Sequence, residues 1–74
     1  MAVKYGYHWR VVTVPRLKAR REHVALTQAE LAAKAGVGRV TIARLENGAA
    51  ARLPTVRKLA EALGVKPAEL MADA

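Results

Sequence analysis

The chain has 74 residues, a length that favours one domain with one small core. Its 13 Lys and Arg residues outnumber 6 Asp and Glu residues, and the formal net charge of +7 favours a polyanionic partner. Cysteine is absent and the two histidines show no metal-ligand spacing, so disulfides and a zinc site are excluded. No apolar run is long enough to span a bilayer, so no membrane partner is expected.

Residues 1–13 differ from the rest of the chain because they contain all three aromatic residues, at alternate positions. Tyr5, Tyr7 and Trp9 in this pattern predict a short β-strand or arm. A lone strand leaves its backbone unpaired, which leaves three alternatives open. The arm folds over its own domain, pairs with the same strand of a second copy, or contacts DNA phosphates through Lys4 and Arg10.

The first helix is expected to begin at Val14 or Pro15 and to end near Val24. Thr13 would cap it, and Pro15 would occupy the first turn, where a missing N–H costs nothing. Its apolar positions are few, so its packing depends on residues such as Leu17.

A second helix is predicted from Gln28 onwards by a local capping signal. Thr27 can accept a hydrogen bond from the backbone of Glu30, whose side chain can reach back to the N–H of Thr27. Gly36 then supplies the residue best suited to a left-handed helix end. The chain is therefore expected to turn there.

A third helix is predicted over residues 38–47. Its apolar spacing predicts an inward face of Val37, Thr41, Ile42 and Leu45. Its other face carries Arg39, Val40, Ala43 and Arg44.

The segment after this helix, AAARLP, is predicted to be a loop of small residues. Thr55 would cap a fourth helix, which Gly64 would end. An amphipathic stripe supports this helix and comprises Val56, Leu59, Ala60 and Leu63. Pro67 would begin a fifth helix, and Leu70 and Met71 would close the bottom of the bundle.

Two motifs resemble a known family. The segments LTQAELA (26–32) and IARLENG (42–48) match the lambda-repressor/Cro-like helix-turn-helix DNA-binding family, of xenobiotic response element type. The resemblance implies an all-α, compact five-helix lambda-repressor-like domain, here over residues 14–74 after an N-terminal strand or arm over 1–13. It also implies that Arg21 forms a structural pair with Glu46, tying the first helix to the end of the third.

A helix of this kind fits the major groove of double-stranded DNA, where each base pair displays its own pattern of donors and acceptors. The residues that reach bases are those at its N-terminal end and one turn later. The predicted base contacts are Arg39, Val40, Ala43 and Arg44. A phosphate contact is the alternative for either arginine. The predicted phosphate contacts, in part carried over from the family, are Gln28, Gly38, Thr41, Asn47 and Arg52.

The family commonly binds inverted half-sites as a two-fold dimer, so a homodimer is expected. The candidate dimer contacts lie in two regions, the arm and the C-terminal part of the domain. They are Tyr5, Tyr7, Trp9, Leu53, Val65 and Leu70.

The predicted function is a sequence-specific regulator of transcription, a repressor or autoregulator, that acts in the cytoplasm with the nucleoid. The alternative is an antitoxin or adaptor that binds a partner protein on the same fold. No paired carboxylates or Ser-His-Asp arrangement is recognisable, so neither catalysis nor a cofactor is expected.

Overall fold

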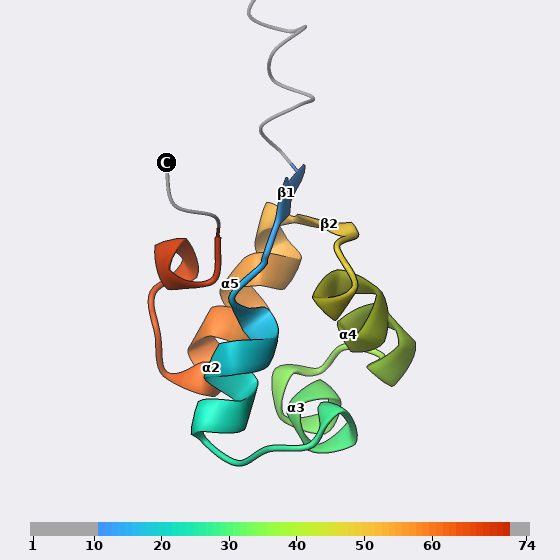
Figure 1. The fold of residues 1–74 in the computed structure, drawn as a ribbon, viewed down its shortest axis with the longest axis vertical. Coiled ribbons are helices and arrows are strands. Elements are labelled where there is room, and N and C mark those ends of the chain that lie inside the picture. Colours follow the sequence, from blue (N-terminus) through green and yellow to red (C-terminus); the bar gives the residue numbers. More distant parts are fainter. Residues whose placement is uncertain (1–10, 72–74) are drawn as a thin grey trace, which may run out of the picture.

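A computed structural model describes residues 11–71 (Figure 1). The elements in chain order are β1 (Val11–Thr13), α2 (Leu17–His23), α3 (Gln28–Ala35), α4 (Arg39–Glu46), β2 (Ala50–Arg52), α5 (Leu53–Leu63) and the 3₁₀ turn η1 (Pro67–Glu69). Within these residues there are four α-helices and a two-stranded sheet. The expected five-helix, all-α architecture is therefore wrong in its helix count and in omitting the sheet.

The expected fifth helix is a single 3₁₀ turn. The backbone N–H of Leu70 donates to the carbonyl of Pro67 at 3.0 Å, and the carbonyl of Leu70 then accepts from the N–H of Arg16 at 3.2 Å. Leu70 is fully buried at this point. The chain thus stops turning because Leu70 enters the core and its backbone pairs with the segment before α2.

Helix α2 is shorter than predicted because Val14, Pro15 and Arg16 form a turn between β1 and the helix. Thr13 lies in β1 and does not cap the helix, whose first residue is Leu17. Beyond its other end, Ala25 has a positive φ of 58°. The N–H of Leu26 donates to the carbonyl of Arg21 at 3.1 Å, which closes the helix with a left-handed alanine in the place that glycine usually occupies.

Helix α3 begins and ends as predicted. The side chain of Thr27 accepts from the N–H of Glu30 at 3.0 Å, and the Glu30 carboxylate accepts from the N–H of Thr27 at 2.8 Å. Gly36 closes the helix in the left-handed conformation, with φ 72°. These contacts confirm the capping box and the glycine turn.

The two strands pair antiparallel, with Val11 opposite Arg52 and Thr13 opposite Ala50. The predicted loop after α4 is therefore partly a strand, and the described end of the predicted lone strand has a partner inside its own domain. Val12 packs against the core, whereas Val11 is 42% exposed. The aromatic part of the predicted arm, in residues 1–10, lies outside the described residues.

Helix α5 begins at Leu53, two residues before the predicted cap Thr55. Arg52 takes the cap position in an extended conformation because it also ends β2. Pro54 fits the first turn without losing a hydrogen bond. The predicted apolar stripe is confirmed as buried, in Val56, Leu59, Ala60 and Leu63.

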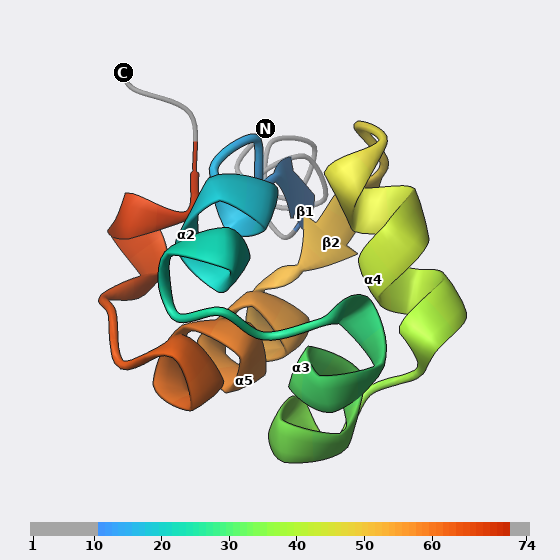
Figure 2. The ribbon, with the colours of Figure 1, turned by 60° about the horizontal axis from the view of Figure 1, so that its bottom comes forward.

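One core lies between the four helices (Figure 2). Each helix contributes a side chain with 0% exposure, and these are Leu17, Leu31, Ile42 and Leu59. Because Ile42 is anchored there, the opposite face of α4 is held outward. The fold therefore holds α4 against the core by its inner face and leaves its outer face exposed.

Candidate nucleic-acid interface

Helix α4 divides into a buried and an exposed face. Ile42 and Leu45 are buried, while Arg39, Val40 and Arg44 are exposed, Val40 by 60%. Within residues 11–71 neither Arg39 nor Arg44 forms an ion pair. Both guanidinium groups are thus available to an external acceptor.

Ala43 is half-buried, so this predicted base contact lies at the edge of the exposed face. Thr41 is exposed, although its place in the helical pattern predicted an inward position.

The N-terminal end of α4 carries neither a side-chain cap nor an acidic residue in its first turn. Gly38 holds the cap position in an extended conformation and provides no side chain. The first-turn N–H groups therefore add positive electrostatic potential beside Arg39. This end of the helix suits an anionic ligand.

The Glu46 carboxylate, at the C-terminal end of α4, is buried and fully engaged. Arg21 Nε donates to Glu46 Oε2 at 2.6 Å, and Arg21 Nη2 donates to Glu46 Oε1 at 3.0 Å. The Arg21 and Glu46 side chains are 10% and 4% exposed. The predicted pair is therefore present as a bidentate, buried ion pair.

The pair binds two further groups. Arg21 Nη1 donates to the carbonyl of Leu26 at 2.8 Å, and Gln28 Nε2 donates to Glu46 Oε1 at 3.0 Å. Burial alone raises the pKa of Glu46, but the hydrogen bonds from Arg21 and Gln28 outweigh burial and lower that pKa below its ordinary value. The hydrogen bond to Glu46 outweighs burial at Arg21 as well and raises the pKa of its guanidinium. Both groups thus stay ionised.

The structure separates the predicted phosphate contacts into two groups. Gly38, Thr41, Asn47 and Arg52 are exposed, Asn47 at the end of α4 and Arg52 at the end of β2. Gln28 is half-buried and already bonded to Glu46. Sequence reasoning missed that bond, because the family motif contains both residues without indicating that they touch.

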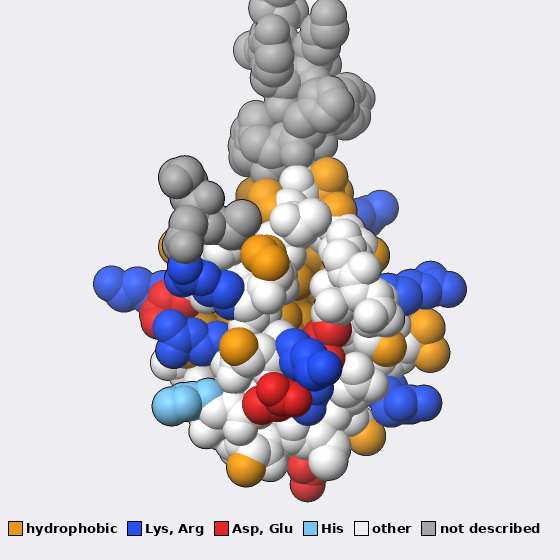
Figure 3. All heavy atoms as spheres, viewed as in Figure 1, with side chains coloured by type: hydrophobic (Ala, Val, Ile, Leu, Met, Phe, Trp, Pro, Cys, Tyr) orange, Lys and Arg blue, Asp and Glu red, His pale blue; other side chains and the backbone are white. Residues whose placement is uncertain are grey.

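Basic side chains project on both sides of the view in Figure 3, and one of these is the side where α4 lies. In the described part of the chain, no three His, Cys, Asp or Glu residues gather as a metal site would require. Over the same residues, no helix is both long enough and apolar enough to cross a membrane.

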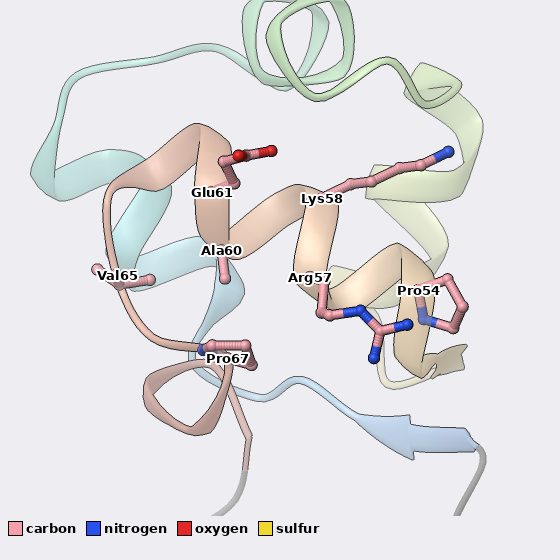
Figure 4. A pocket seen from close by; sticks show the side chains of 7 residues that line it. All are labelled: Pro54, Arg57, Lys58, Ala60, Glu61, Val65 and Pro67. Carbon is pink, nitrogen blue, oxygen red and sulfur yellow. The ribbon is translucent and has the colours of Figure 1, made fainter.

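A shallow groove of about 540 Å³ lies between α5 and η1. Its lining is Pro54, Arg57, Lys58, Ala60, Glu61, Val65 and Pro67 (Figure 4). Of the candidate dimer contacts, Val65 lines this groove and Leu53 is half-buried. Leu70 faces the core with 0% exposure, so it offers no surface to a second subunit.

Comparison with known proteins gives consistent matches. A helix-turn-helix family model matches residues 17–70. The crystal structure of the restriction-modification controller protein C.AhdI from Aeromonas hydrophila is similar at a TM-score of 0.73 and 34% identity, over 77% of this chain and 88% of that one. A mutant of hydroxyethylphosphonate dioxygenase is similar at a TM-score of 0.72 and 30% identity, over 85% of this chain but 14% of that enzyme.

Proposed function

The chain belongs to the helix-turn-helix family of DNA-binding transcription regulators, and we propose that it recognises a specific duplex DNA site by placing α4 in the major groove. The observation that carries this proposal is the exposed face of α4. Arg39 and Arg44 project from it without ion pairs to other described residues, while the one acid of α4, Glu46, is buried and neutralised by Arg21.

The chemistry of this face suits base edges. An arginine fork can donate to O6 and N7 of one guanine, and Val40 can lie against a thymine methyl group. Asn47, at the end of α4, and Arg52, at the end of β2, are exposed, which supports a role for both in contacting the phosphates that flank the groove. We therefore assign base recognition to α4 and backbone contacts to the segment that follows it.

We further propose that the protein binds an inverted repeat as a homodimer through the groove on α5. A two-fold interface brings the same patch of two subunits together. The groove supports such an interface because it places the cation Arg57 and the anion Glu61 beside apolar residues such as Val65. In a symmetric pair, Arg57 of each subunit can face Glu61 of the other.

We also propose that the protein is a repressor or autoregulator, that it acts with the nucleoid and that it performs no catalysis. The 34% identity to a restriction-modification controller protein supports a regulatory role. The narrower xenobiotic response element type is a proposal that rests on the segments LTQAELA and IARLENG.

Selection from random DNA fragments tests the function directly. The purified protein is mixed with a random duplex library, and the retained DNA is sequenced over several rounds. We expect enrichment of two inverted half-sites whose centres lie about 10 base pairs apart. Retention without sequence enrichment would contradict specific recognition, and a single half-site would contradict the dimer.

A further inference from the structure

The hydrogen bond between Gln28 and Glu46 links α3 to α4 at the end of the helix-turn-helix unit opposite the connecting turn. Gln28 is the first residue of α3 and Glu46 is the last residue of α4. At the other end, the two helices are joined by the turn at Gly36. The 3.0 Å bond from Gln28 Nε2 to Glu46 Oε1 thus links the two termini that the backbone does not connect.

This bond fixes the orientation of the Gln28 carboxamide. An ionised carboxylate only accepts hydrogen bonds, so the NH₂ group of Gln28 must face Glu46. Rotating the amide by half a turn would place its carbonyl oxygen against Glu46 Oε1 and break the bond. Arg21 holds both oxygens of Glu46, so the carboxylate cannot turn away to accommodate that change.

The fixed orientation matters for binding an anion. One N–H of the Gln28 NH₂ group is used by Glu46, and the second N–H is the donor that remains. A phosphate oxygen needs such a donor and would be repelled by the amide carbonyl. A side chain that is already ordered also loses less conformational freedom when it binds.

We propose that Glu46 is a positioning residue for DNA binding, which holds the Gln28 carboxamide so that its second N–H is directed to a backbone phosphate. The inference rests on the proposed function, since it requires Gln28 to meet DNA. It assigns to Glu46 a role in addition to its structural pairing with Arg21.

The test is a double-mutant cycle in which the affinity of each variant for one DNA duplex of fixed sequence is measured. The variants are Gln28→Ala, Glu46→Gln and the double variant, with Glu30→Gln as the matched control. Glu30→Gln removes the same charge from the same end of α3 and retains a capping-box residue. Circular dichroism at the assay temperature establishes that each variant is folded.

We expect Gln28→Ala to weaken binding about three- to tenfold, the effect of one hydrogen bond. Glu46→Gln should weaken binding by a similar factor relative to Glu30→Gln, because a neutral amide no longer imposes one orientation on Gln28. In the Gln28→Ala background, Glu46→Gln should cause no further loss. If the double variant loses affinity by the product of the two single losses, the two residues act independently. That result would overturn the proposal while leaving the DNA-binding function intact. A wild-type protein that binds no DNA would instead overturn the proposed function together with this inference.

A second measurement needs no variant. Gln28 is the only glutamine and Asn47 the only asparagine, so a nitrogen-correlated NMR spectrum contains two side-chain amide pairs. In the free wild-type protein, one proton of the Gln28 pair should exchange with water more slowly than the other, whereas the two Asn47 protons should exchange alike. Equal, fast exchange of both Gln28 protons would show an unrestrained amide and overturn the proposal.

Discussion

The side chains of Arg21 and Glu46 are joined by two parallel hydrogen bonds of 2.6 and 3.0 Å, and these bonds link α2 to the end of α4. Because both side chains are nearly excluded from water, each depends on the other for compensation of its charge. The contact therefore stabilises the packing of α2 against the end of α4.

Removing one member of this pair should be costly. Arg21→Met is expected to lower the free energy of unfolding by about 3–5 kcal/mol, because Glu46 is left as an uncompensated buried charge. The double variant with Glu46→Leu should lose less than the sum of the single changes. Thermal unfolding of the cycle measures this coupling. Arg20→Met is the matched control, since its ion pair with Glu69 is more than a third exposed and should contribute less than about 1 kcal/mol.

Stability should depend on pH through Glu46. Its pKa is lower in the folded chain than in the unfolded chain, where a glutamate titrates at about 4.3. The stabilisation is therefore complete above the unfolded value and is lost as the pH falls through the interval down to the folded value. Chemical denaturation between pH 7 and pH 2.5 should show a smaller loss for Glu46→Gln than for the wild type. Parallel curves for the two proteins would contradict this assignment.

The α4 arginines should affect specificity more than general affinity. Arg39→Ala and Arg44→Ala should each cost about 1–3 kcal/mol on the selected site and much less on random DNA. Gln28→Ala should weaken binding to all sequences alike, because a phosphate contact carries no sequence information. Fluorescence anisotropy on both duplexes separates these effects. Lys34→Ala, in the last turn of α3, is the control for loss of one exposed positive charge.

The proposed dimer interface predicts a charge-swap effect. Arg57→Glu and Glu61→Arg each place like charges opposite one another in a symmetric pair and should shift the protein towards monomer. The double variant restores opposite charges and should recover the dimer. Sedimentation velocity measures the mass, with Lys18→Glu on α2 as a reversal away from the groove. A dimer that survives both single reversals would locate the interface elsewhere.

The left-handed Ala25 predicts a stabilising substitution. An alanine at φ 58° costs about 1–2 kcal/mol relative to a right-handed conformation, whereas glycine adopts this region freely. Part of the gain is offset by the greater freedom of glycine in the unfolded chain. Ala25→Gly should therefore raise stability by up to about 1 kcal/mol in denaturant titration. Ala33→Gly, exposed within α3, should lower it by about 1 kcal/mol.

Local signals explain what could be predicted from the sequence. The capping residues of α3 and the glycine after it lie within a few residues of one another, so their contacts follow from spacing alone. The exposed face of α4 followed from helical period. By contrast, β2 consists of Ala50, Ala51 and Arg52, which have little preference for a strand, and its pairing depends on β1 far away in the chain.

Two other features could not be predicted from local sequence patterns. Pro67 marks where a helix can begin, but the length of η1 depends on how Leu70 packs in the core. The hydrogen bond from Gln28 to Glu46 depends on how α3 crosses α4, and each residue already had a separate expected role. Long-range geometry, which motif spacing does not encode, decided both.

The pairing of β1 with β2 also has a consequence for the order of folding. All of α2, α3 and α4 lie between the two strands, so the strands close a loop that contains the whole helix-turn-helix unit. The entropic cost of bringing the two strands together is smallest once the three helices between them have packed. We expect the sheet to form last and to open first. Amide hydrogens of its paired strands should therefore exchange through a local opening, whereas those of Leu31 and Ile42 should exchange only through global unfolding.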